Sequence, residues 1–279
     1  MIEVLAPGPL ATVQDLGRAG YAQLGVGRSG AADRRSHALA NRIAGNRPTA
    51  ATVELTLGGF TARFATDAVL ALAGAPVPAT AGDRVVPLHE PVRIRAGEVL
   101  RIRSPRDGLR TYLAVRGGIG GPKVLGSRSA DLLAGIVPVP VRRGSVLAVD
   151  TEAAADPRAE QGEALPAELV LRILPGPRDG WFGPGAVPGL CADPYEVGRD
   201  SNRVGLRLSG RRLDRARPGV LPPEGMVPGA LQVPPDGQPV LFLADHPVTG
   251  GYPVIAVVAE DSLALAAQAR PGRAIRFML

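Results

Sequence analysis

The sequence is poor in lysine, cysteine and histidine, and each shortage excludes a class of site. Lys123 is the single lysine among 32 basic residues. It lies in neither the Gly-x4-Gly-Lys-Ser/Thr loop of NTPases nor the Met-Lys-Met setting of a biotin carrier, so we expect no cofactor bound by this chain alone. The single cysteine, Cys191, excludes an internal disulfide. His37, His89 and His246 have no metal-binding spacing, so we expect no metal site.

Lysine-rich patches and long apolar runs are also missing. The net charge is +6 and the isoelectric point is near 10.3, which would ordinarily favour nucleic acid as a partner. The arginines are dispersed, however, and only 4% of the residues are aromatic, so we expect no nucleic-acid binding. No apolar run approaches the roughly 20 residues that span a bilayer, and no signal peptide is recognisable. The sequence predicts a cytoplasmic protein with no membrane association.

Signatures of covalent catalysis are missing too. No Gly-x-Ser-x-Gly nucleophile motif occurs. Ser201, His246 and Asp245 are residue types of a catalytic triad, but we expect no triad here. An aspartate and a histidine that are adjacent in sequence do not easily orient as a relay.

The pattern that is present favours a mainly β fold with two β-rich lobes. From residue 52 onward, short alternating segments are separated by glycine- and proline-rich turns at intervals of about ten residues, which is typical of sandwiches and barrels. Residues 151–165 are acidic and rich in alanine without apolar periodicity, which is typical of a linker or an exposed loop. We therefore expect one lobe over 1–150 and a second over 166–279.

One main helix is predicted near residues 31–44. Ser29 is a plausible N-cap, and Asp33 favours the positive end of the helix dipole. Asp33, His37 and Asn41 recur every four residues and form a polar stripe on this helix. The stripe is either a solvated face or a set of ordered contacts, and the sequence leaves both interpretations open. A shorter helix is predicted at 261–269.

The stretch 225–258 is the strongest candidate for function. Two apolar runs, 240–244 and 254–258, have the length and composition of buried strands, and the segment between them is polar. Gly250 and Gly251 suggest backbone conformations closed to other residues, with N–H groups that a ligand could approach. A plain tight hairpin is the alternative.

The remaining polar residues suit recognition of a small molecule with a planar amide or a carboxylate. Arginine binds a carboxylate through two parallel hydrogen bonds, and Asp, Asn and Gln match amide N–H and C=O groups. Asp245, Arg203 and Tyr252 are the candidates for catalytic roles. The predicted substrate-binding residues are Asp33, Asn41, Glu54, Ser201, Asn202, Arg203, Gln232, Asp245, Thr249, Gly250, Gly251 and Tyr252.

Ordered motifs run along nearly the whole chain, among them Thr-Val-Gln-Asp-Leu-Gly-Arg, Leu-Gly-Ser-Arg-Ser and Thr-Gly-Gly-Tyr-Pro. The full set of these motifs occupies residues 12–18, 29–33, 54–59, 112–118, 125–129, 201–208, 232–239 and 249–253. In this order they resemble a biotin-dependent carboxyltransferase-like family. Its members are variously called the 5-oxoprolinase C subunit, KipA or allophanate hydrolase subunit 2. Two positions depart from the pattern: Val248 stands where many relatives have threonine, and Ala32 where methionine is common.

The resemblance implies a cyclophilin-like barrel architecture and a partner chain of the KipI type, which is the B subunit of the same enzyme. It implies that the chain acts with subunits A and B in an ATP-dependent 5-oxoprolinase, where ATP is used by the complex. One alternative is a carboxyltransferase subunit acting on urea or a related amide, with biotin on a separate carrier. A second is a non-catalytic, KipA-like regulator that binds a kinase inhibitor.

Overall fold

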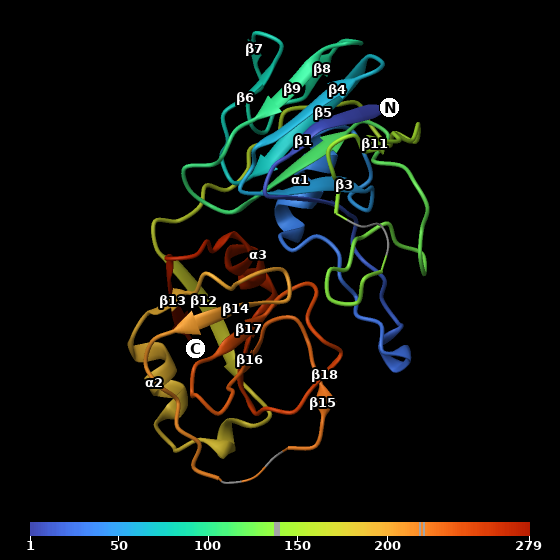
Figure 1. The fold of residues 1–279 in the computed structure, drawn as a ribbon. Helices are drawn as coiled ribbons and strands as arrows, with labels where there is room; N and C mark the ends of the chain where they lie inside the picture. Colours follow the sequence, from blue (N-terminus) through green and yellow to red (C-terminus); the bar gives the residue numbers. More distant parts are fainter. Residues whose placement is uncertain (137–139, 218, 220) are drawn as a thin grey trace. The chain divides into compact units, whose positions relative to one another are not determined.

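The structure is a computed structural model that describes residues 1–136, 140–217, 219 and 221–279. It divides into two compact units (Figure 1). The first comprises 1–18, 29–131 and 135–165, and the second comprises 19–28, 132–134 and 166–279. Each unit is built mainly from β-strands, which confirms the expected fold class.

The first unit holds two sheets and one helix. Its strands are β1 (Ile2–Pro7), β2 (Leu10–Gln14), β3 (Thr52–Thr56), β4 (Phe60–Phe64), β5 (Ala68–Gly74), β6 (Ala79–Ala81), β7 (Arg84–Val85), β8 (Val92–Ile94), β9 (Val99–Ile102), β10 (Arg110–Val115) and β11 (Val146–Leu147). A six-stranded sheet has the order β11-β1-β4-β9-β6-β7, and a five-stranded sheet has the order β2-β3-β10-β5-β8. Neighbouring strands in both sheets are antiparallel within the described ranges.

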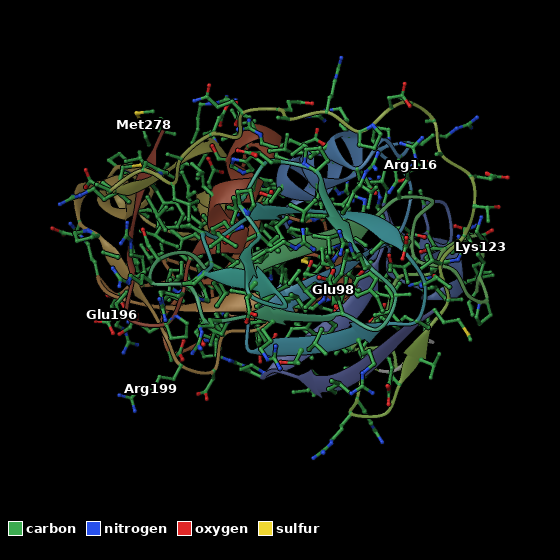
Figure 2. The ribbon with its side chains drawn as sticks, turned by 90° about the horizontal axis from the view of Figure 1, so that it is seen from above. Glu98, Arg116, Lys123, Glu196, Arg199 and Met278 are labelled. Atoms are coloured by element: carbon green, nitrogen blue, oxygen red, sulfur yellow. The ribbon has the colours of Figure 1, made fainter. Side chains whose placement is uncertain are left out.

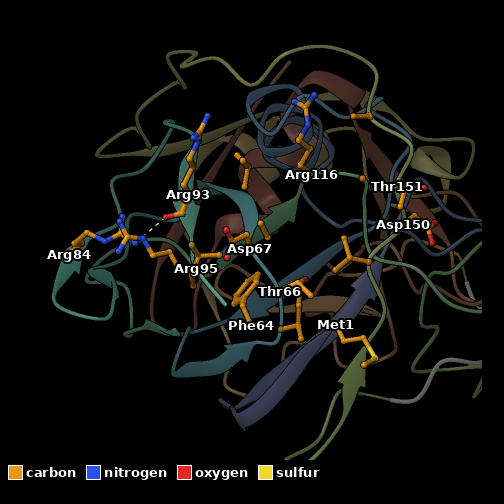
Figure 3. Close-up of a pocket in the computed structure, with 17 residues that line it drawn as sticks. Met1, Phe64, Thr66, Asp67, Arg84, Arg93, Arg95, Arg116, Asp150 and Thr151 are labelled. Carbon is orange, nitrogen blue, oxygen red and sulfur yellow. Dashed lines mark hydrogen bonds between the residues drawn. The ribbon is translucent and has the colours of Figure 1, made fainter. Parts of the chain in front are cut away.

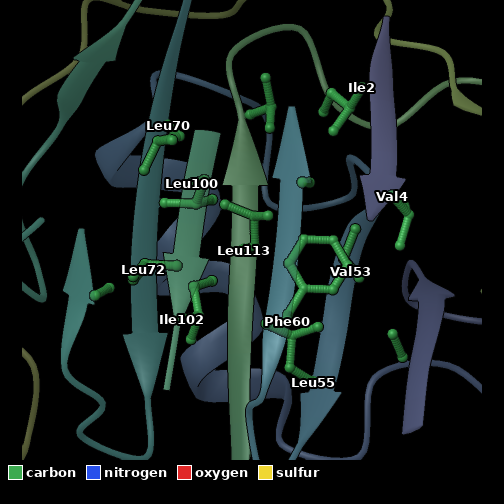
Figure 4. Close-up of a cluster of buried hydrophobic side chains, with 14 of the residues drawn as sticks. Ile2, Val4, Val53, Leu55, Phe60, Leu70, Leu72, Leu100, Ile102 and Leu113 are labelled. Carbon is green, nitrogen blue, oxygen red and sulfur yellow. The ribbon is translucent and has the colours of Figure 1, made fainter. Parts of the chain in front are cut away.

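The two sheets bury a shared apolar core, which Figure 4 shows. Strand β5 explains how one strand serves two faces. Its Leu70 and Leu72 lie in the core between the sheets, whereas Ala71 and Ala73 lie in the cluster beneath α1 (Arg34–Ile43). Successive side chains on a strand point to opposite faces, so large residues fill the sandwich and small ones admit the helix.

The second unit is a closed barrel with the order β12-β19-β16-β17-β14-β13-β20. Its strands are β12 (Leu169–Pro175), β13 (Tyr195–Val197), β14 (Gly205–Ser209), β16 (Ala230–Gln232), β17 (Val240–Phe242), β19 (Val254–Val258) and β20 (Ala274–Met278). A separate two-stranded sheet pairs β15 (Glu224–Gly225) with β18 (Thr249–Gly250). Leucine, isoleucine and phenylalanine side chains fill the interior. Closure leaves the barrel with no open sheet edge.

The helices refine the sequence expectations. The main helix runs from Arg34 to Ile43, and its N-cap is Asp33, which accepts a hydrogen bond from the Ser36 backbone N–H; the expected N-cap Ser29 is wrong. The polar stripe does not face solvent, because His37 and Asn41 are fully buried. The helix predicted near 261–269 is confirmed as α3 (Glu260–Gln268). A further helix, α2 (Ala186–Ala192), was not expected.

Residues 151–165 belong to the first unit and contact its helix. Arg42 of α1 binds the Glu160 carboxylate with an N–O distance of 2.6 Å, and the Arg158 N–H donates to the Ile43 carbonyl. The proposed domain boundaries remain a prediction, but these contacts tie this segment to α1.

Charged side chains such as Lys123, Glu196 and Arg199 project from the surface (Figure 2). Within the described part of the chain, no helix is long and apolar enough to cross a bilayer.

Candidate functional site

The candidate stretch 225–258 is not a hairpin. Strands β17 and β19 are both present, but β16 lies between them and pairs with each. Because both are antiparallel to β16, β17 and β19 run parallel to each other, so the connection over 243–253 returns from one end of the barrel to the other. It carries the short strand β18, which pairs with β15. We refer to residues 245–252 as the site loop.

A buried ion pair anchors the start of the site loop. Arg203 and Asp245 are 1% and 2% exposed, and the guanidinium donates two hydrogen bonds to the carboxylate, at 2.9 and 3.0 Å. The Asp245 N–H donates to the Arg203 carbonyl, and the Leu132 N–H donates to the Asp245 carboxylate. This geometry holds the loop in place, because both charged groups are directed at each other in a site closed from water.

Gly250 is restricted by the side chains packed against it rather than by its backbone conformation. A Cβ on Gly250 would lie 2.5 Å from Nε2 of Gln232, whereas one on Gly251 would find its nearest neighbour, the Leu221 carbonyl oxygen, at 3.6 Å. Neither glycine has a positive φ. The expectation that both glycines adopt conformations closed to other residues is therefore wrong.

Gln232 links the barrel to the site loop. Its Nε2 donates to the Tyr252 carbonyl at 3.0 Å and approaches the Met226 sulfur at 3.8 Å. Its side-chain oxygen accepts no hydrogen bond from any residue in the described ranges. Gln232 is only 6% exposed, so most of its side chain is packed between the barrel and the loop.

The tip of the loop reaches solvent. Thr249 is exposed, and Tyr252 is 43% exposed. The guanidinium of Arg215 lies 5.6 Å from the centre of the Tyr252 ring, a cation–π arrangement. Arg215 also donates to the Val233 carbonyl at 2.9 Å, and its buried Nε has no hydrogen-bond partner among the described residues.

Arg215 is a candidate that sequence reasoning missed. No motif marks it, and it is one of many dispersed arginines. Only its position beside Tyr252 makes it notable.

Ser201 and Asn202 shape a turn. The Ser201 hydroxyl accepts from the Arg207 N–H at 3.0 Å, and the Asn202 side-chain oxygen accepts from the Val204 N–H at 2.8 Å. Short polar side chains commonly stabilise turns in this way. These two residues orient the segment that carries Arg203.

The three candidates in the first unit, Asp33, Asn41 and Glu54, are 3%, 0% and 1% exposed. Glu54 accepts from the Tyr112 hydroxyl at 2.7 Å and from the Ala32 N–H at 3.0 Å. Asn41 donates to the Ala50 carbonyl at 2.8 Å. Their polar groups are engaged inside the first unit.

Burial controls protonation in this cluster. Desolvation raises the pKa of Tyr112 well above its usual value, and the neighbouring Glu54 charge raises it further. Desolvation lowers the pKa of His37 to about 4, despite its hydrogen bond with the Pro48 carbonyl. Both side chains are therefore neutral near pH 7.

A second buried cluster joins two motifs that are far apart in sequence. The Asp15 carboxylate accepts from the Ser127 and Ser129 hydroxyls at 2.6 and 2.7 Å and from the Arg128 and Gly17 N–H groups. Burial opposes ionisation of Asp15, but these hydrogen bonds together lower its pKa. The motifs at 12–18 and 125–129 thus form one structural unit.

No group of three or more histidine, cysteine, aspartate or glutamate side chains with the geometry to hold a metal occurs among the described residues.

The similarity of this chain to known proteins identifies a carboxyltransferase-type domain. A family model for the carboxyltransferase domain, subdomains A and B, matches residues 24–279. The chain superimposes on a crystal structure of TTHA0988 with a TM-score of 0.92 and 37% identity, covering 100% of this chain and 55% of that one. It matches the Kluyveromyces lactis urea amidolyase with a TM-score of 0.91 and 32% identity, covering 99% and 18%.

The chain belongs to the carboxyltransferase subdomain A and B family, which confirms the resemblance. It is 36% identical to the 5-oxoprolinase C subunit of Escherichia coli K12, covering 100% of this chain and 91% of that protein. It is 34% identical to urea amidolyase of Lachancea kluyveri, covering 99% of this chain and 17% of that protein. It spans 55% of the TTHA0988 chain in one crystal form and 99% of the chain in another.

Proposed function

We propose that this chain is the C subunit of an ATP-dependent 5-oxoprolinase, acting with subunits A and B to hydrolyse 5-oxo-L-proline to L-glutamate. The observation that carries the proposal is the extent of the match to the Escherichia coli C subunit, which covers 91% of that protein. The match to the Lachancea kluyveri urea amidolyase covers only 17% of that much longer protein.

The chemistry of the site loop supports an amide substrate. In the proposed reaction the lactam C–N bond breaks, water supplies the oxygen of the new carboxylate, and the nitrogen takes up a proton and stays in the product as its amino group. A planar N–C=O group needs an acceptor for its N–H and donors for the charge that develops on its oxygen. Gln232 offers an unused acceptor, and the hydroxyls of Thr249 and Tyr252 are exposed donors.

Arg203 and Asp245 are proposed as positioning residues. Their ion pair fixes the start of the site loop, so they act through the residues at its tip rather than by touching substrate. The open tip is proposed to be half of a site that a KipI-type partner, the B subunit, completes. ATP is assigned to the complex, and no residue of the site loop is assigned to ATP.

The test is reconstitution. The chain is mixed with subunits A and B, and glutamate release from 5-oxoproline is followed with and without ATP. We expect release only in the complete mixture with ATP. A complete mixture that forms a complex but releases no glutamate would overturn the proposal.

A urea-directed carboxyltransferase is the second candidate, because the Lachancea kluyveri urea amidolyase is 34% identical over 99% of this chain. It predicts that activity needs a biotinylated carrier and is blocked by avidin. Avidin-insensitive turnover of 5-oxoproline would exclude it.

A further inference from the structure

A pocket of about 780 Å³ opens in the first unit, separate from the residues of the site loop (Figure 3). Its walls come from several segments that are distant in sequence. They include the start of β1, the turn at 64–69 between β4 and β5, β8, the end of β10 and residues 149–153. All the lining residues belong to the first unit. The volume lies within the range of pockets that hold small organic ligands.

The charge of the pocket is dominated by arginine. Four arginines and two aspartates line it. Arg93 and Arg95 stand two positions apart, and Ile94 between them is buried in the core. Alternate residues of an extended backbone project from the same face, so both side chains leave the same face of this segment, and both line the pocket. Neither side chain makes a hydrogen bond or an ion pair within the described part of the chain, although the Arg95 charge acts on Glu98, which also accepts a hydrogen bond from the Arg95 backbone N–H.

The other two arginines are held in place. Arg84 pairs with Glu98 at 2.9 Å and donates to the Arg93 carbonyl at 3.0 Å. Arg116 donates to the Ala155 carbonyl at 2.9 Å. Figure 3 shows Arg84, Arg93 and Arg95 together on one side of the pocket and Arg116 on another. An anion that contacts both sides must be extended.

The two aspartates are partly occupied. Asp150 pairs with Arg128 at 2.9 Å. One oxygen of Asp67 accepts from the Ala96 N–H at 2.8 Å, which leaves its other oxygen to accept from a hydroxyl group. Asp67 repels any phosphate placed beside it, so a ligand that fills the pocket must present a hydroxyl to Asp67 and keep its phosphates at the arginines.

We infer that this pocket binds a small molecule bearing a diphosphate or triphosphate group, with a nucleoside phosphate as the best match. Arg93 and Arg95 take the phosphate group, because a guanidinium fork matches two phosphate oxygens. Arg116 holds the opposite end of the ligand, and Asp67 accepts from a sugar hydroxyl. This site is additional to the amide site of the proposed function and does not depend on it.

The test is isothermal titration of the purified chain with ADP, ATP, pyrophosphate, phosphate and adenosine at fixed ionic strength. The wild-type chain should bind the nucleotides saturably, with phosphate and adenosine much weaker. The double variant R93Q/R95Q should lose about tenfold or more in affinity, because each lost charged hydrogen bond weakens binding. Both arginines are exposed, so this variant should keep its fold and thermal midpoint.

The matched control is R142Q/R143Q, which removes the same charge from two exposed arginines outside the pocket. Its affinity should equal that of the wild type. Tighter binding of ADP than of pyrophosphate supports the nucleotide, and equal binding supports the shared diphosphate chemistry. Absence of nucleotide binding by the wild type, or an equal loss in both double variants, would overturn the inference. Glutamate release by the complex is measured separately, so the two proposals can fail independently.

Discussion

The buried polar cluster of the first unit and the site loop of the second contain the same kinds of residue in different settings. Around Glu54, the Tyr112 hydroxyl and the Asn41 amide are hydrogen-bonded within the first unit and closed from water. In the site loop, Asp245 is equally buried, but Thr249 and Tyr252 at the tip reach solvent. The motif residues therefore fall into two groups. The buried ones stabilise the fold, and the exposed ones are able to contact a ligand.

The largest expected effect on stability tests the buried Arg203–Asp245 ion pair at the start of the site loop. Asp245→Ala leaves the Arg203 charge buried without its carboxylate, which costs about 3–5 kcal/mol of unfolding free energy. The control, Asp214→Ala, breaks an exposed ion pair with Arg212 and should cost at most about 1 kcal/mol. Urea denaturation measures both. Equally small losses of unfolding free energy in the two variants would show that the Arg203–Asp245 ion pair does not stabilise the fold.

The second effect tests the buried cluster of the first unit through pH. Burial lowers the pKa of His37 to about 4, below its usual 6.5, so the unfolded chain takes up this proton first. The stability due to neutral His37 is complete above pH 6.5 and is lost as pH falls towards 4, by roughly 3 kcal/mol.

Urea midpoints at pH 7 and pH 5 measure this loss, and His37→Gln should flatten it. His89 also has a lowered pKa, because it is partly desolvated, and contributes a smaller loss of the same sign. An unchanged slope in the His37→Gln variant would assign the effect to other groups.

The third effect compares two adjacent glycines of the site loop. Gly250→Ala places a Cβ 2.5 Å from the Gln232 amide nitrogen and should cost about 1–3 kcal/mol through overpacking. Gly251→Ala meets its nearest neighbour at 3.6 Å and should change stability by less than about 0.5 kcal/mol. Thermal and urea unfolding of the two variants measure this difference in stability. Equal costs would mean that both positions are restricted.

Much of the fold followed from local pattern, and much of the site did not. Alternation and turn spacing predicted β-strands, but the pairing of β16 with both β17 and β19 is a long-range contact that no local pattern reveals. Spacing placed His37 and Asn41 on one helical face, yet burial of that face depends on the sheet beneath it. Arg215 had no sequence signal, because its role depends on proximity to Tyr252.

The smallest expected change in stability tests the tip of the loop. Tyr252→Phe keeps the ring that faces Arg215 and removes only an exposed hydroxyl, so stability should change by less than about 0.5 kcal/mol. If that hydroxyl donates to the substrate oxygen, kcat/KM of the reconstituted complex should fall by about tenfold or more. Tyr21→Phe, the same change at a tyrosine outside the loop, serves as the control. If Tyr252→Phe lowers the unfolding free energy by more than about 1 kcal/mol, the tip of the loop has a structural role like that of the buried cluster. Normal stability with reduced turnover would instead show that the tip differs from the buried cluster in function.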